Sequence, residues 1–271
     1  MKTSRLILTA SALATAAIIA AGCDSSSKED KVRQFDQLSG KTIVVQKGTT
    51  FDEMLAEKYP SYNVKRVSTF IDIYSAVVSG EADYGIDEDV TASLILSSGL
   101  AIDTVHADIP AVPMGAIFHK SNTELQAQFN DFINELESSG KLSELRTKWF
   151  GSASPSSLPV PHCNVTEGKP LRVITEGDYP PFNLTISGSV SGFDVELCTL
   201  FAEKLGRPLV VTAMAFDDII PFIAKGKADM SIAGISITEE RAKQVLFSVP
   251  YNYTYTTIVS SKTAKKLSSH H

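Results

Sequence analysis

A linker rich in proline and serine, residues 152–170, divides this chain of 271 residues into two blocks. The block before it ends on residues 141–151 (KLSELRTKWFG), a helical run typical of the last residues of a protein. The block after it opens on residues 171–182 (LRVITEGDYPPF), a run typical of a first strand. The linker has no hydrophobic periodicity, which predicts irregular backbone. The two blocks therefore stand in exchanged order, and any fold for this chain has to accommodate that order.

The N-terminus has the pattern of an export signal. A short basic start precedes about 16 apolar or small residues, a length that is short for a membrane span and usual for a signal peptide. The run Ala-Ala-Gly-Cys that ends at Cys23 resembles a lipobox, in which the cysteine is acylated; the alternative is an ordinary cleavage site. The polar residues after it predict a flexible tether. We expect a lipoprotein signal peptide over residues 1–22, a tether over 23–37, and an exported protein held on a membrane by lipid.

Composition argues against some function classes and leaves cysteine pairing open. The net charge is −6 and no stretch is basic, so nothing suggests nucleic-acid binding. The histidines show no metal-ligand spacing, and we expect neither a metal nor a cofactor. An oxidising compartment would permit a disulfide between Cys163 and Cys198. Spacing alone supplies no geometry, so a buried Cys198 with an unpaired Cys163 stays the alternative.

Strands and helices alternate along both blocks, which predicts an α/β fold with mainly parallel strand pairing. The roughly 230 residues after the tether are enough for one large domain or two small lobes. Short apolar runs predict strands over residues 42–46, 63–68, 83–87, 114–119, 171–175, 209–214, 230–233 and 255–260. Helical spacing predicts helices over residues 51–59, 70–78, 90–97, 123–138, 142–149, 193–205, 216–224 and 239–245.

One loop at a strand end carries residues suited to a small anionic group. Gly234 lets the backbone approach a ligand closely, and Thr238 is a good helix cap. Arg241, one turn into the helix, can grip a carboxylate with two parallel hydrogen bonds. The alternative is an ordinary helix start with a solvated arginine.

The first block carries two comparable loops. Thr49 and Thr50 open a helix directly after a strand, and the free N–H groups of that helix start favour an anion. Asp87, Glu88 and Asp89 form a carboxylate cluster at the end of another strand, where one member can accept a ligand ammonium. The alternatives are an ordinary helix cap and a solvated acidic turn.

An aromatic corner follows the first strand of the second block. Residues 179–182 (YPPF) are rigid and can form the wall of a small pocket, with plain core packing as the alternative. Glu176 lies just before this corner, and Phe216 opens a helix after another strand. In open α/β sheets, such strand-end loops are where ligands bind.

Together these motifs resemble the polar amino-acid-binding proteins of ABC importers, which are type II periplasmic solute-binding proteins of family 3. The first lobe of that family resembles residues 175–182 (TEGDYPPF), 192–197 (GFDVEL), 233–241 (AGISITEER) and 247–251 (FSVPY). The second lobe resembles residues 38–50 and 79–89, and the family's C-terminal helix resembles the KWFG run. The resemblance covers nearly all of residues 38–262 and implies a two-lobed α/β fold with two hinge crossings.

The order of these motifs departs from the family. There, the first-strand motif comes first and the KWFG end comes last, whereas here the chain starts inside the second lobe and reaches the first strand only after the linker. We therefore expect a circular permutant, with a fragment of a tandem array as the alternative. The expected parts are a second lobe of residues 38–108 and 256–262, a first lobe of 115–151 and 169–249, a permutation linker of 152–168, and hinge crossings at about 109–114 and 250–255.

The resemblance also implies a role for each site residue. Arg241 takes the ligand α-carboxylate, together with the backbone N–H groups of Ser236 and Thr50. The carbonyl of Gly234 and the carboxylate of Glu88 take the α-ammonium, although the choice between Asp87 and Glu88 stays open because many relatives have Asp there. Tyr179 and Phe216 enclose the ligand side chain, and Glu176, Gln46 and Asp87 reach its polar end. The expected ligand-binding set is Gln46, Thr49, Thr50, Asp87, Glu88, Glu176, Tyr179, Phe216, Ala233, Gly234, Ser236 and Arg241.

The function implied is a monomeric, membrane-tethered extracytoplasmic receptor. It binds a polar amino acid between its lobes and delivers the ligand to the permease of an ABC importer. The acids Glu176 and Asp87 hint at a cationic or amide side chain on the ligand. One alternative is a cyclohexadienyl dehydratase on the same fold, in which Glu88 or Glu176 would act as the acid. The other is an amino-acid sensor without transport.

Overall fold

The structure is a computed structural model and describes residues 34–262. The expected signal peptide, the lipidation site Cys23 and most of the expected tether lie outside these residues. Within them, no helix combines the length and apolarity needed to cross a bilayer. The 3-10 helix η1 (Phe35–Leu38) falls partly in the stretch expected to be tether, yet Phe35 is buried against the core. The folded part therefore begins earlier than the expected boundary at residue 38.

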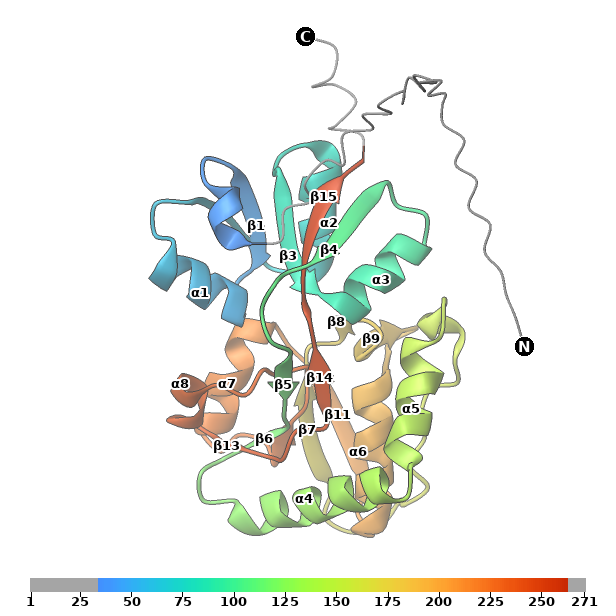
Figure 1. Ribbon diagram of the computed structural model, residues 1–271. Coiled ribbons are helices and arrows are strands. Elements are labelled where there is room, and N and C mark those ends of the chain that lie inside the picture. The colour runs from blue at the N-terminus through green and yellow to red at the C-terminus, as the bar shows by residue number, and fades with distance from the viewer. Residues whose placement is uncertain (1–33, 263–271) are drawn as a thin grey trace, which may run out of the picture. The chain divides into compact units, whose positions relative to one another are not determined.

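The second lobe is built on a five-stranded sheet in the order β2-β1-β3-β15-β4 (Figure 1). The apolar run of β1 is continuous and buried on both faces, with Ile43 and Val45 in one hydrophobic cluster and Val44 in another, as is usual for a central parallel strand. The elements of this lobe are β1 (Thr42–Gln46), α1 (Thr50–Lys58), β2 (Asn63–Val67), α2 (Phe70–Ser79), β3 (Tyr84–Glu88), α3 (Asp89–Ser97), β4 (Ile102–His106) and β15 (Thr256–Ser261).

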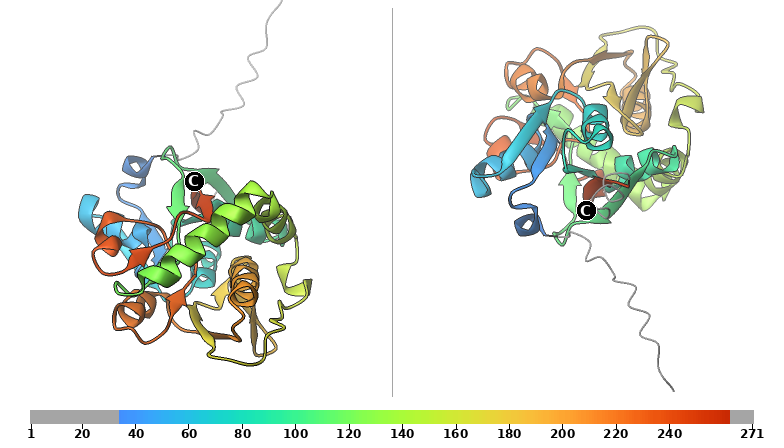
Figure 2. Two further views of the ribbon diagram at one scale, coloured as in Figure 1. Left: turned by 90° about the horizontal axis from the view of Figure 1, so that it is seen from below. Right: turned by 90° about the horizontal axis from the view of Figure 1, so that it is seen from above.

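The first lobe has a second five-stranded sheet, in the order β11-β7-β12-β6-β13. Trp149, Phe129 and Phe201 belong to the hydrophobic core of this lobe, and Figure 2 (left) shows α4 running across the lobe. Its elements are β6 (Ile117–Phe118), α4 (Thr123–Ser138), α5 (Lys141–Phe150), η2 (Pro155–Ser157), β7 (Leu171–Thr175), β8 (Asp178–Tyr179), β9 (Asn183–Ile186), β10 (Ser189–Ser191), α6 (Phe193–Lys204), β11 (Leu209–Ala213), α7 (Phe216–Ala224), β12 (Met230–Ser231), α8 (Glu239–Ala242) and β13 (Leu246–Phe247).

Two short strands carry the chain between the lobes. β5 (Val112–Met114) connects β4 to β6, and β14 (Asn252–Thr254) connects β13 to β15. They pair with each other in antiparallel register, with Asn252 opposite Met114 and Thr254 opposite Val112 (Figure 1). The two-lobed α/β fold expected from the sequence is therefore present, and the chain crosses twice between the lobes.

The expectation of mainly parallel pairing is wrong. Each large sheet contains two parallel and two antiparallel ladders, because one strand in each runs against the other four. These reversed strands are β15 and β6, which directly follow the crossings. Thr256 of β15 starts opposite Glu88, at the carboxyl end of β3, and Ile117 of β6 lies opposite Ser231, at the end of β12. A chain that arrives at the carboxyl edge of a parallel sheet can only run back through it.

Other differences concern short elements. The three-stranded antiparallel sheet β10-β9-β8 was not expected, because its strands are two to four residues long and too short to show a period. Helix α8 ends at Ala242 rather than at residue 245. The long helix α4 has the bounds that its apolar spacing predicts, Thr123–Ser138.

The linker is without strands, as expected, and contains only the short turn η2. Both cysteines in the described part of the chain are free thiols, with Cys198 buried and Cys163 half-buried, so the bridge left open above does not form. The end of the linker is fixed by hydrogen bonds from Arg207 to the carbonyl oxygens of Lys169 and Pro170.

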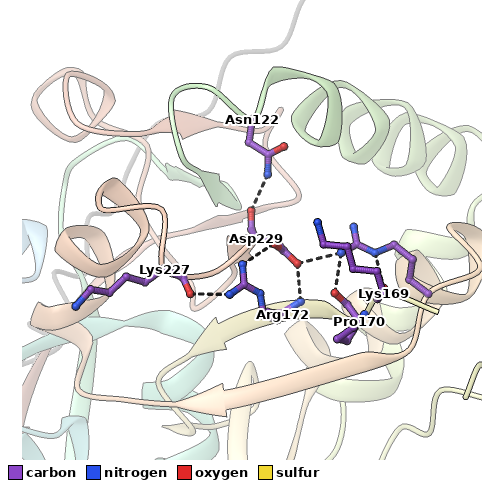
Figure 3. A network of polar contacts seen from close by, with 7 residues as sticks. Asn122, Lys169, Pro170, Arg172, Lys227 and Asp229 are labelled. Carbon is purple, nitrogen blue, oxygen red and sulfur yellow. Dashed lines mark hydrogen bonds and ion pairs between the residues drawn. The ribbon is translucent and has the colours of Figure 1, made fainter. Parts of the chain in front are cut away.

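Asp229 lies near the end of the linker, and its hydrogen bonds fix the amino end of β7 (Figure 3). Its carboxylate accepts hydrogen bonds from the backbone and side chain of Arg172 and from Arg207, each at 3.0 Å. Its backbone carbonyl accepts a hydrogen bond from Asn122, at the start of α4. The network therefore joins the linker, β7, β12 and α4 at the edge of the sheet that faces away from the carboxyl ends of the strands.

Candidate ligand-binding site

Loops at the carboxyl ends of the strands of both sheets enclose one cavity. All twelve residues expected from the sequence to bind a ligand line it. Three further residues were not expected, Phe51, Ile73 and Ile86, because an apolar side chain facing a cavity has the same sequence pattern as one facing the core. The lining comprises Gln46, Thr49, Thr50, Phe51, Ile73, Ile86, Asp87, Glu88, Glu176, Tyr179, Phe216, Ala233, Gly234, Ser236 and Arg241.

The cavity is narrow because its polar side chains bond to one another across it. The space open to the centre of a water-sized sphere is about 20 Å³, which is room for about one water molecule. The side-chain amide of Gln46, in the second lobe, donates to Glu176 in the first lobe. The hydroxyl of Tyr179, in the first lobe, donates to Glu88 in the second lobe at 2.5 Å. These bonds hold the two walls of the cavity together.

Arg241 is positioned by the cap of α8. Thr238 accepts a hydrogen bond from the Arg241 backbone N–H at 3.2 Å, so the side chain leaves the first turn toward the second lobe. The side chain is buried, and its Nη2 donates to the carbonyl of Gly48 at 2.9 Å and lies 3.4 Å from Glu53. Its Nε has no hydrogen-bond partner among residues 34–262.

The surroundings of the Arg241 guanidinium suit an incoming anion. Burial lowers the pKa of this guanidinium below its ordinary value, while the charge of Glu53 opposes the shift. The ring of Phe216 lies 5.9 Å from Cζ and covers part of the guanidinium. A buried N–H group without a partner carries a desolvation cost that an acceptor such as a carboxylate oxygen removes.

Asp87 and Glu88 place two carboxylates at the end of β3. Asp87 accepts hydrogen bonds from the Tyr74 hydroxyl at 2.6 Å and from the Glu88 backbone N–H at 2.8 Å. Burial, reinforced by the neighbouring Glu88, raises the pKa of Asp87 well above its ordinary value, and burial also raises the pKa of Glu88. The pair therefore holds a proton more readily than two exposed carboxylates and gains from a nearby cation.

Glu176 adds a third buried carboxylate, from the end of β7. Burial raises its pKa from 4.5 to about 7, and the hydrogen bond from Gln46 opposes that shift. Three buried carboxylates thus share the cavity with one guanidinium, which makes its lining rich in acceptors. Such a lining favours a ligand that carries one carboxylate and one or more cationic or donor groups.

Glycines allow close approach of the backbone at two points, Gly234 in the cavity lining and Gly48 beside it. Gly234 has φ +60°, and a Cβ at this position would lie 2.9 Å from Cε1 of Tyr179. Gly48 has φ +76°, and its Cβ would lie 2.9 Å from Cβ of Asp217 in the other lobe. Only glycine fits either position without displacing its neighbour.

The two aromatic rings expected to enclose a ligand side chain both line the cavity, and each has a partner in the protein. Tyr179 stacks on Phe182 with a centroid distance of 5.2 Å and an interplanar angle of 7°. Phe216 lies under Arg241, as described above. Two polar contacts join the lobes outside the cavity, from Lys47 to Asp217 at 2.5 Å and from the Thr91 hydroxyl to the Pro180 carbonyl at 3.3 Å.

Comparison with known proteins gives a match over most of the chain. A model of the bacterial extracellular solute-binding proteins, family 3, matches residues 7–152 and 171–268. Cyclohexadienyl dehydratase of Pseudomonas aeruginosa is 41% identical over 88 residues, which are 32% of this chain and 33% of that protein. The putative ABC transporter arginine-binding protein 2 of Escherichia coli is 35% identical over 89 residues, which are 32% and 37% of the two chains.

The remaining similarities are also partial. The arginine-binding extracellular protein ArtP of Bacillus subtilis is 37% identical over 94 residues, 35% of this chain and 37% of that protein. The chain thus spans about a third of the length of these curated relatives. A crystal structure of the arginine-bound form of domain 1 from TmArgBP is 37% identical, with 36% of this chain and 84% of that chain covered and a TM-score of 0.30.

Proposed function

Because the chain belongs to the bacterial extracellular solute-binding proteins, family 3, we propose that it is a membrane-tethered extracytoplasmic receptor for a polar amino acid and delivers this ligand to an ABC importer. The observation that carries the proposal is that one cavity is lined by three buried carboxylates and by the buried Arg241, whose Nε–H has no hydrogen-bond partner within the described part of the chain. An α-amino acid presents the complementary pair of charges. Most of the curated relatives described above are named as binding proteins, and arginine is the ligand in two of those names.

The roles of the site residues follow from charge complementarity. Arg241 binds the α-carboxylate, assisted by the backbone N–H groups of Ser236 and Thr50, which start or precede helices on opposite walls. Glu88 and the Gly234 carbonyl bind the α-ammonium. Each charge loses its hydration on entering the cavity, so each needs a fixed partner. Charge-assisted hydrogen bonds contribute about 1.5–3 kcal/mol each, and several of them offset the entropy of capture to give micromolar binding, on the order of −8 kcal/mol.

The polar end of the ligand side chain meets Glu176, Gln46 and Asp87. Two of these residues are carboxylic acids with raised pKa values. A cationic or strongly donating side chain lets both acids ionise, because an opposite charge within about 4–6 Å favours the charged form of a carboxylate. We therefore propose a cationic or amide side chain.

Ligand entry requires the lobes to separate, since the cavity has room for about one water molecule in the described state. On entry the ligand replaces the bonds from Gln46 to Glu176 and from Tyr179 to Glu88 with bonds to its own groups. We propose that β5 and β14 are the hinges, because they connect the lobes and pair only with each other among the described strands. We propose that the ligand-free protein populates this separated state in solution, so small-angle scattering should show a smaller radius of gyration on ligand addition. An unchanged profile while calorimetry records binding would refute closure.

The exchanged order of the blocks is best explained by circular permutation. The family match in two segments separated at the linker supports it, as does the pairing of β15 with β3 and β4 of the second lobe. A chain that runs from residue 169 to 262 and continues from 34 to 151 through a short Gly-Ser joint tests the proposal. It should fold and bind the same amino acid with a similar Kd. A rearranged chain that stays unfolded would favour the tandem-fragment alternative.

A screen by thermal shift against the proteinogenic amino acids tests the function directly. Ligand at 100 times its Kd stabilises the folded state by about 2.7 kcal/mol, so one class of amino acid should raise the melting temperature by several degrees. Isothermal titration calorimetry then gives the Kd. No shift with any of the amino acids would reject the receptor proposal.

One observation favours a second candidate, a cyclohexadienyl dehydratase activity. Glu176 has a pKa raised to about 7 inside a buried cavity, which is the state of a carboxyl group able to donate a proton near neutral pH. The dehydratase of Pseudomonas aeruginosa is also among the relatives. Incubation with prephenate separates the candidates, because only the enzyme would form phenylpyruvate faster than a protein-free control. A sensor without transport would bind amino acids as well, and co-purification with a permease in the presence of ligand distinguishes it.

A further inference from the structure

A buried carboxylate that the proposed function does not use lies behind the cavity. Asp194 is fully buried near the start of α6, and burial raises its pKa to about 7. Among residues 34–262 no cationic side chain forms an ion pair with it, and hydrogen bonds from Asn183 and from the Tyr251 hydroxyl oppose the shift. Burying a carboxylate costs free energy, which hydrogen bonds and protonation offset, so the groups that bond to Asp194 are held firmly to it.

One connection from Asp194 leads to the loop after β7. Asn183 donates to Oδ2 of Asp194 at 3.0 Å, and the side-chain carbonyl of the same asparagine accepts from the Gly177 backbone N–H at 2.7 Å. Gly177 follows Glu176 directly, at φ +76°. The carboxylate thus orients the Asn183 amide, and that amide fixes the turn that aims Glu176 into the cavity.

A second connection leads to the loop after β12. The Gly234 backbone N–H donates to the Tyr251 hydroxyl oxygen at 3.1 Å. Because this oxygen accepts from Gly234, the hydroxyl proton can be donated to Asp194. Burial raises the pKa of Tyr251, and the charge of Asp194 raises it further. Tyr251 is fully buried and lies directly before the crossing strand β14, and its backbone N–H donates to Met114 of β5 at 3.0 Å.

We propose that Asp194 is a positioning residue for the ligand cavity, which acts through Asn183 on the Glu176 loop and through Tyr251 on Gly234. The inference rests on the proposed amino-acid-binding function. It assigns to one buried carboxylate the alignment of two loops that contact different parts of the ligand. Because Tyr251 also adjoins both crossing strands, the alignment of Gly234 is linked to the place where the lobes hinge.

The Tyr251→Phe variant removes only the hydroxyl. Without it, the Gly234 N–H loses its partner and the direction of the adjacent carbonyl, the proposed ammonium acceptor, is no longer fixed. We expect about tenfold weaker binding of the amino acid identified by the thermal-shift screen. Binding of the deaminated analogue of that amino acid, measured by competition, should change less than about twofold, because this ligand has no ammonium. The control is Tyr253→Phe, two residues further along and 58% exposed, which should bind both ligands as the unchanged protein does.

Asp194→Asn provides the second test. We expect about tenfold weaker amino-acid binding, and the double variant with Tyr251→Phe should bind within about threefold of either single variant, because residues that act through one another are not additive. A double variant that is about 100-fold weaker would show independent effects and overturn the proposal. Equal losses for the amino acid and its deaminated analogue in Tyr251→Phe would also overturn it, since they indicate a merely structural role. If the unchanged protein binds no amino acid, both the receptor function and this inference fail. If it binds one and Tyr251→Phe has no effect, only the inference fails.

Discussion

Carboxylates at the two ends of β7 have opposite surroundings. At its amino end, burial alone would raise the pKa of Asp229, but hydrogen bonds from Arg172 and the charge of Arg207 lower it below its ordinary value. At its carboxyl end, Glu176 has no arginine partner among residues 34–262, and burial raises its pKa to about 7. We propose that the difference separates stability from function: the cationic partners of Asp229 fix it within the fold, whereas Glu176 is kept available for a ligand.

Arg172, near the amino end of β7, and Arg241, in the cavity at its carboxyl end, should differ in the same way. Replacing Arg241 should have the largest effect on binding. Arg241→Ala removes the buried guanidinium with the free Nε–H and should weaken amino-acid binding more than about 100-fold, because a charge-assisted pair of hydrogen bonds is lost. Calorimetry measures the Kd, and circular dichroism checks the fold.

The matched control for that variant is Arg172→Ala, in the Asp229 network. It should lower the melting temperature and leave the Kd within about twofold, since its side chain lies at the far end of the strand from the cavity. An unchanged Kd for Arg241→Ala would place the ligand elsewhere and remove the basis of the comparison.

The Glu176 carboxyl should make stability depend on pH in a defined direction. Its folded pKa, about 7, is above its ordinary value of 4.5, so the folded state holds a proton that the unfolded state releases. The contribution of Glu176 to the free energy of unfolding is therefore fully present below about pH 4.5. It decreases as the pH rises toward 7, by on the order of 1–3 kcal/mol. Urea unfolding at pH 5 and pH 7 should show this decrease in the unchanged protein and a smaller one in Glu176→Gln.

Glu240→Gln is the control for the same substitution on a 70% exposed side chain, and it should leave the pH dependence as it is. Added ligand should oppose the decrease if its cationic group meets the ionised Glu176. A pH dependence in Glu176→Gln as steep as in the unchanged protein would show that this carboxyl is not protonated in the folded state near neutral pH.

Much of the cavity could be predicted from the sequence, because its polar residues stand in strand-end loops with recognisable signals. Thr238 followed by Glu239, Glu240 and Arg241 marks a capped helix start, and the structure has that cap. Each such loop alone fits an ordinary turn. Their convergence follows from the sheet topology, which brings the carboxyl ends of strands from both blocks to one place.

The rest could not be predicted for physical reasons that differ from residue to residue. Ile73 and Ile86 line the cavity, yet their apolar spacing is that of any core position. The reversed direction of β15 depends on where the chain crosses between lobes, which a local pattern does not encode. The raised pKa of Glu176 depends on burial by side chains distant in sequence. The link from Asp194 to Gly234 passes through Tyr251, 57 and 17 residues away in the chain, and no motif joins the three.

Replacing Asp229 should have the smallest effect of these variants, and stability from Asp229 should depend on pH in the opposite direction to stability from Glu176. Its folded pKa is lowered, so it contributes stability that is present above about pH 4 and is lost as the pH falls through the folded pKa. Asp229→Asn should therefore reduce the free energy of unfolding at pH 7 by about 1–2 kcal/mol, a difference that should shrink toward zero near pH 3. The Kd for the amino acid should stay within about twofold. A loss of binding without a loss of stability would mean that the two ends of β7 are not separated in function, because the amino-end network would then control the geometry of the cavity.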